Sequence, residues 1–223
     1  MKTRVVLATV LVGSLSAFVS HGAMAQTGPA VPGYTHGQKS LARAPYTLQD
    51  LESLKTTMIF TDEDVRYLRM SKAILADQTD AILDVWYGFV ASTPELVASF
   101  KNNKTGAPDA AYLAAVRKRF GQWIVDTADA NYDQAWLDYQ YEIGRRHTNP
   151  KKNQTDKADS VPSVNFRYLS ALTIPVTTTL KPFLAKKGAS PADVEKMHAA
   201  WVKSVLMQTI LWSYPYVRDG RFL

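Results

Sequence analysis

His147 is the residue whose type and position in the chain best suit chemistry. Ile143, Tyr139 and Trp136 precede it by four, eight and eleven residues. On a helix with 3.6 residues per turn, these steps place all four side chains on one apolar face. Pro150 ends the pattern, because proline cannot donate a backbone N–H. The sequence therefore predicts an imidazole at the last turn of a helix, facing the core, either as a metal or haem ligand or as a hydrogen-bonded core residue.

Aromatic side chains on two other predicted helices could line a flat apolar cofactor next to this histidine. Trp86 and Tyr87 lie on one of these helices and Phe120 on the next. Taken singly, each of them is also explained as an ordinary core residue. Their residue types are compatible with a cofactor pocket but do not identify one.

The absence of cysteine excludes several kinds of site. With no Cys in 223 residues, the chain has no disulfide, no thiolate metal site and no C-x-x-C-H motif for covalent haem attachment. Any haem must therefore be held without a covalent link to the protein.

The first 25 residues have the pattern of a signal peptide. A basic start is followed by an apolar stretch over residues 5–19 and by the small-residue motif Ala23-Met24-Ala25. The alternative is an uncleaved membrane anchor, but the apolar stretch is short for a span. We expect cleavage before Gln26, export to the periplasm or beyond the cell, and no stable membrane anchor after cleavage.

The charge of the chain says little about its partners. The formal net charge is +6, and pairs such as Arg145-Arg146, Lys151-Lys152 and Lys186-Lys187 are scattered among acidic residues. Such pairs are usually solvated, so we interpret them as surface and expect no nucleic-acid partner.

Apolar periodicity and helix-capping residues predict an all-α protein after an extended arm over residues 26–46. The expected helices cover residues 47–58, 61–92, 94–100, 109–128, 132–148, 162–185 with bends at Pro175 and Pro182, and 191–214. The last helix is apolar on most sides. It must therefore be central in the domain or shared with a second subunit.

Several long sequence strings closely resemble those of the protoglobins, single-domain haem proteins of the globin superfamily. The strings are DVWYGF at 84–89, YLAAVRKRF at 112–120, YDQAWLDYQYEIG at 132–144, KKNQTD at 151–156, KPFLAK at 181–186 and LWSYPYV at 211–217. The resemblance extends over essentially the whole chain after the predicted signal peptide.

This resemblance implies a globin-like helical sandwich over residues 47–223, with an additional N-terminal helix, around haem b (iron protoporphyrin IX). His147 falls at the family's proximal iron ligand. A ligating imidazole usually donates its second ring N–H to an acceptor, and the Ile143 carbonyl, one turn earlier, is the acceptor we expect. Gly144 has no side chain and could allow the haem to approach the helix.

On the opposite side of the haem, the resemblance makes Tyr87 the distal tyrosine and Trp86 its neighbour. Phe120, Leu172 and Val176 match further pocket positions, and Leu172 stands where a relative has phenylalanine. Family habit and the apolar last helix together favour a homodimer through the C-terminal helices. His36, in the arm, is expected either to be exposed or to contact a haem propionate.

Three functions follow from these patterns. The first is binding of the diatomic gases O2, CO and NO at a pentacoordinate iron, as a scavenger, carrier or sensor. The alternative is a haem enzyme acting on nitric oxide, nitrite or peroxide, with a capacity for carbene transfer. No spare histidine has a supported distal position, which favours binding over turnover. The third, a haem-free helical interaction protein, requires His147 to be only a core residue.

Overall fold

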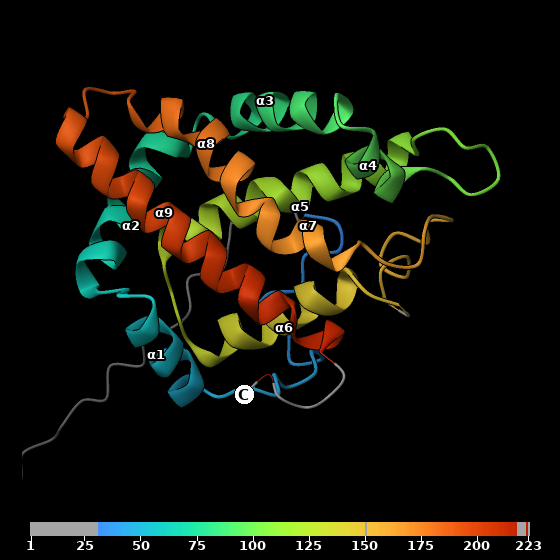
Figure 1. The fold of residues 1–223 in the computed structure, drawn as a ribbon, viewed down its shortest axis with the longest axis horizontal. Coiled ribbons are helices and arrows are strands. Elements are labelled where there is room, and N and C mark those ends of the chain that lie inside the picture. Colours follow the sequence, from blue (N-terminus) through green and yellow to red (C-terminus); the bar gives the residue numbers. More distant parts are fainter. Residues whose placement is uncertain (1–30, 150, 218–221, 223) are drawn as a thin grey trace, which may run out of the picture.

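The computed structural model describes residues 31–149, 151–217 and 222, and its regular structure there is helical apart from a single bridge between Lys101 and Pro108. The predicted all-α class is confirmed (Figure 1). The elements are α1 Leu48–Thr57, α2 Asp62–Leu75, α3 Thr79–Ala91, α4 Pro94–Val97, the 3-10 turn η1 Ala98–Phe100, α5 Ala110–Asp129, α6 Gln134–Arg146, α7 Phe166–Ala171, α8 Thr173–Leu184, α9 Pro191–Trp212 and the 3-10 turn η2 Tyr214–Tyr216. The predicted signal peptide lies outside the described residues.

The first two helices begin where the capping residues predict. Thr47 precedes α1, and its backbone N–H donates to Asp50 Oδ2 at 2.7 Å, while Asp50 N–H donates back to Thr47 Oγ1 at 3.2 Å. Before α2, the Thr61 N–H donates to Asp64 Oδ2 at 2.8 Å. These bonds satisfy N–H groups that a helix start leaves without partners.

The single helix predicted over residues 61–92 is wrong, because the chain turns at residues 76–78 and forms α2 and α3. Gln78 Nε2 donates to the Ile74 carbonyl at 2.6 Å and to the Phe183 carbonyl at 3.4 Å, which holds the turn against α8. Leu75 and Ile82, on either side of the turn, enter the same core. Apolar periodicity therefore continues through the turn and gives no sign of the change in direction.

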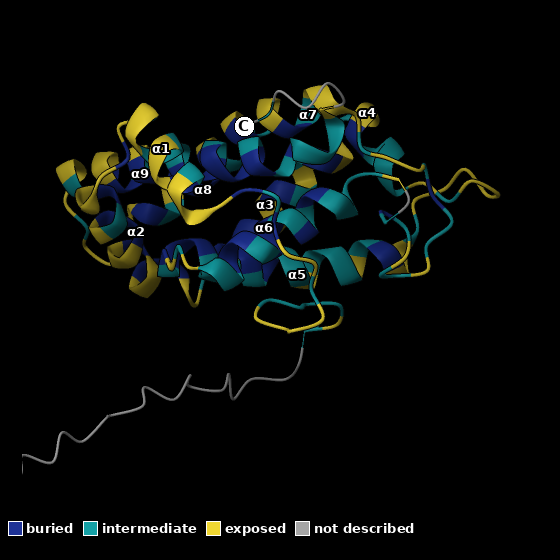
Figure 2. Cartoon of the chain, turned by 90° about the horizontal axis from the view of Figure 1, so that it is seen from below, coloured by how far each residue is buried: buried dark blue, intermediate teal, exposed yellow. Residues whose placement is uncertain are grey.

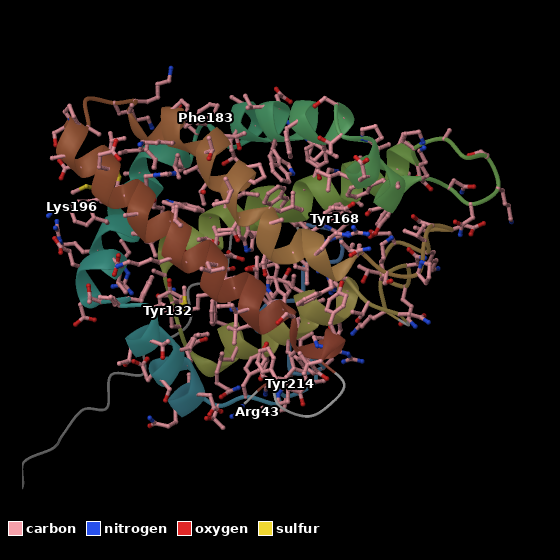
Figure 3. All side chains as sticks on the ribbon, in the orientation of Figure 1. Arg43, Tyr132, Tyr168, Phe183, Lys196 and Tyr214 are labelled. Carbon is pink, nitrogen blue, oxygen red and sulfur yellow. The ribbon has the colours of Figure 1, made fainter. Side chains whose placement is uncertain are left out.

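The helix predicted over residues 162–185 starts later and divides into α7 and α8 at Leu172. A proline ring clashes with the carbonyl four residues earlier, so Pro175 explains why α7 ends at Ala171. Pro175 then lies in the first turn of α8, where a missing N–H costs no helical bond. Figure 3 marks Tyr168 on α7 and Phe183 near the far end of α8, which pack against two different hydrophobic clusters.

Helix α9 is the centre of the molecule. It contacts α2, α6, α7 and α8, and it runs diagonally across the other helices in Figure 1. Met197, Trp201 and Met207 on α9 are completely buried, and Figure 2 shows the buried residues concentrated between the helices. The expectation that an all-round apolar helix is central is therefore met. None of the described helices is both long and apolar enough to cross a membrane.

Candidate functional site

A cavity of about 270 Å³ opens between α3, α5, α6, α8 and α9, and its wall is mainly apolar. Seven of the eight residues that sequence analysis proposed for the site line this cavity. They are Trp86, Tyr87, Phe120, Ile143, His147, Leu172 and Val176. Four separate helices and the α7–α8 junction supply them, so the fold gathers residues that are up to about two fifths of the chain apart.

His147 caps the C-terminal end of α6 with its ring in the cavity wall. Nδ1 lies 2.8 Å from the Ile143 carbonyl oxygen, so the expected hydrogen bond between the ring and this carbonyl is present. A carbonyl only accepts, so Nδ1 must carry the proton, which leaves Nε2 of the neutral ring with a free lone pair. Burial lowers the pKa of His147, which keeps the ring neutral near pH 7. The ring is in the protonation state that ligation of a metal requires.

The position of the His147 ring is fixed from two further directions. The Trp212 indole stacks on it, with ring centres 5.7 Å apart and planes at 15°. The His147 carbonyl accepts from the Val164 N–H at 2.8 Å, and the Tyr216 hydroxyl lies 3.0 Å from the same oxygen. The end of α6 is thus attached to the following loop and to η2.

Gly144 is the proposed site residue that does not line the cavity. A Cβ built on Gly144 would lie 2.8 Å from the carbonyl oxygen and 3.0 Å from Cα of Trp212. The missing side chain therefore lets α6 approach the end of α9. The expectation that Gly144 makes room for the haem is corrected, because this position faces protein backbone.

The opposite wall is aromatic. Trp86 and Phe120 meet edge to face, with ring centres 5.7 Å apart. Beside them, burial raises the pKa of Tyr87 far above the neutral range, so its hydroxyl stays protonated and can donate. Within the described part of the chain, no protein group hydrogen-bonds this hydroxyl. Tyr87 therefore presents a free donor in an apolar surrounding.

Three cationic side chains that sequence analysis missed also line the cavity. Arg119 forms two parallel hydrogen bonds to Asp156, at 2.9 and 2.5 Å, and Arg146 Nε donates to a Glu142 oxygen at 2.8 Å. The interpretation of Arg146 and Lys152 as solvated surface residues is wrong. The Arg146 side chain is only 13% exposed, and Lys152 as a whole is 3% exposed.

Lys152 differs from the two arginines because no carboxylate of the described residues pairs with it. Its Nζ donates to the Ser99 carbonyl at 2.9 Å and lies 3.4 Å from Ser160 Oγ. Burial lowers the pKa of Lys152 to about 8. A buried ammonium without a counter-charge is unfavourable, so this position is suited to an anionic group entering the cavity.

The arm segment from residue 31 to 46 has no regular secondary structure and is bound to two of these cations. Arg119 donates to the Pro32 carbonyl at 3.0 Å, and Arg146 donates to the Gly33 carbonyl at 2.6 Å. His36 is half-buried and stacks on Tyr139, with ring centres 5.4 Å apart, so it is neither exposed nor part of the cavity lining. The expectation that His36 is exposed is therefore wrong, and contact with a haem propionate stays a prediction.

The helical arrangement matches a known fold. The globin domain of a Geobacter sulfurreducens globin-coupled sensor superposes with a TM-score of 0.57 at 17% sequence identity, covering 75% of this chain and 97% of that domain. At this identity the match establishes the fold alone, and that fold is the globin fold. A comparison with curated proteins gave no match.

The family follows from a direct sequence comparison. The protoglobin family model matches residues 47–222, so the chain belongs to the protoglobin family. The resemblance noted in the sequence is confirmed. As a protoglobin, the protein is a haem globin that binds gaseous ligands.

Proposed function

We propose that this protoglobin binds haem b non-covalently through His147 and uses the pentacoordinate iron to bind O2, CO or NO. The observation that carries the proposal is the position of the His147 ring in the cavity wall, with Nδ1 2.8 Å from the Ile143 carbonyl oxygen. Protonation at Nδ1 leaves Nε2 available as an iron ligand. Bound haem supplies the iron that takes the diatomic molecule.

The distribution of charge around the cavity fits haem b. Haem b has a flat apolar ring with two carboxylate arms, and the cavity combines an apolar wall with Arg119, Arg146 and Lys152. The two arginines already have carboxylate partners, Asp156 and Glu142. Lys152 has none among the described residues, so it would hold a propionate by a charge-assisted hydrogen bond.

Tyr87 is the residue we assign to ligand control. Its protonated hydroxyl can donate to the partly negative end of a polar diatomic molecule, while Trp86 and Phe120 keep competing water away. An uncharged phenol that stays protonated across the physiological pH range is a constant donor. O2, which becomes polar when bound, gains more from it than CO does.

Substitution of Tyr87 by phenylalanine tests gas binding directly. The variant should bind haem normally but release O2 about tenfold faster, because the donor is removed and the ring remains. Stopped-flow measurement of O2 and CO dissociation would check this, with Tyr168→Phe as the matched control on α7 outside the cavity lining. Equal O2 dissociation rates in wild type and Tyr87→Phe would contradict the role given to Tyr87.

Binding is favoured over catalytic turnover by the composition of the cavity wall. In the described residues that line it, His147 is the single histidine. A peroxide-processing site needs a second acid–base group on the distal side, and the distal wall offers Tyr87, whose raised pKa keeps it a neutral phenol that neither gives up nor takes a proton readily near pH 7. Action on nitric oxide, nitrite or peroxide is therefore the second candidate.

Export and dimerisation complete the proposal. The signal-peptide pattern of residues 1–25 supports a periplasmic or secreted protein that begins at Gln26. Mass spectrometry of the exported protein would test this, and an N-terminus at Met1 would contradict it.

The surface of α9 supports a homodimer through the C-terminal helices. Val202, Leu206 and Ile210 form a half-buried apolar stripe on this helix at four-residue spacing. Sedimentation velocity would test dimerisation, and a monomer at micromolar concentration would contradict it.

A further inference from the structure

Thr173 is a cavity residue whose hydroxyl has no hydrogen-bond partner among the described residues. The residue is 3% exposed, lines the cavity and begins α8. Its Oγ1 is fully enclosed, yet it forms no hydrogen bond with any residue that the structure describes. Buried hydroxyl groups nearly always have a partner, because water is lost when they are enclosed. This hydroxyl therefore requires an explanation.

The other buried threonines show what is unusual about Thr173. Thr177 Oγ1 donates to the Thr173 carbonyl at 2.8 Å, Thr209 Oγ1 donates to the Leu206 carbonyl at 2.9 Å, and Thr127 Oγ1 accepts from Gln208 at 3.2 Å. A threonine inside a helix commonly satisfies its hydroxyl on the preceding turn. Thr173 is the first residue of α8, after the division at Leu172, so no preceding turn of its own helix is available.

Thr173 lines the cavity, so a molecule held there can supply the missing hydrogen-bond partner. Its neighbours in the lining, Leu172 and Val176, are apolar, and Val205 of α9 lines the same space. None of these side chains can accept or donate a hydrogen bond. A molecule held in the cavity can.

We propose that Thr173 is a second ligand-selecting residue, whose hydroxyl hydrogen-bonds a polar diatomic molecule in the cavity together with Tyr87. This inference rests on the gas-binding function proposed above. A hydroxyl can donate to the negative end of bound O2 and gives little to the weakly polar CO. Thr173 would thus raise the preference for O2 over CO.

The experiment compares Thr173→Val with Thr173→Ser. Valine has the shape of threonine without the hydroxyl, whereas serine retains the hydroxyl. With haem bound, Thr173→Val should release O2 about two- to tenfold faster and leave CO dissociation nearly unchanged, and Thr173→Ser should stay close to wild type. Thr177→Val is the matched control, because it removes a hydroxyl of the same helix that does not line the cavity.

A second measurement uses the haem-free protein. Removing a buried hydroxyl that has no hydrogen-bond partner should stabilise the haem-free protein, so Thr173→Val should raise the Tm by about 2–4 °C. Thr177→Val removes the hydrogen bond to the Thr173 carbonyl and should therefore lower the Tm. A lower Tm in Thr173→Val, or equal changes in O2 and CO dissociation, would overturn the proposal. Absence of haem binding in the wild type would instead refute the proposed function, so the two failures are distinguishable.

Discussion

Haem added to a His147→Ala variant should bind with more than about tenfold lower affinity than to wild type, because the substitution removes the proposed iron ligand. The wild-type protein should show a sharp Soret band and a b-type pyridine haemochrome. The variant should lose most of the Soret intensity at one haem per chain. Spectrophotometric titration of the haem-free protein measures both quantities.

Two controls make the result specific to ligation. Free imidazole should restore the spectrum of His147→Ala, since the substitution leaves space where the ring was. His198→Ala replaces a histidine on α9 that does not line the cavity, and it should titrate like wild type. A His147→Ala protein with an unchanged haem spectrum would show that another residue binds the iron.

Alanine at Gly144 should destabilise the haem-free protein by about 1–3 kcal/mol, because the new Cβ would lie 2.8 Å from the Trp212 carbonyl oxygen. The atoms in the way are backbone, so α6 and the end of α9 must separate. That movement also displaces Trp212 from the His147 ring. Urea unfolding gives the change in free energy, and the haem spectrum reports the altered proximal side.

Gly88→Ala is the matched control for this substitution. Gly88 lies within α3, and a Cβ there meets no atom within 4 Å. Alanine favours the helix over glycine by about 0.8–1 kcal/mol, so this variant should be more stable than wild type. The same chemical change should therefore have opposite signs at the two positions. Stabilisation of both variants would show that α6 and α9 can separate without cost.

The sequence predicted the site best where the relevant interactions are local. His147 and the Ile143 carbonyl are one helical turn apart, so their contact could be expected from their spacing alone. Gly144 was assigned wrongly because its neighbour, Trp212, comes from the far end of the chain and depends on how α6 crosses α9. Periodicity locates a residue on a helix face, but it does not say which element covers that face.

The same reasoning explains the polar residues that were missed. Lys152 and Arg146 are of types that usually remain in water, and only the tertiary arrangement encloses them around the cavity. Thr173 looks like an ordinary helical threonine in the sequence. Its hydroxyl has no hydrogen-bond partner among the described residues, and Thr173 begins α8 directly after the division at Leu172, which is a property of the junction and not of the residue type.

The attachment of the His147 carbonyl has a mechanical consequence. Val164 and Tyr216 bind the same oxygen, and Trp212 rests on the ring of the same residue. A displacement of the His147 backbone must therefore stretch hydrogen bonds to η2 and to the loop before α7. The rigidity with which the His147 ring is held in the cavity wall thus depends on segments outside α6 as well as on α6 itself.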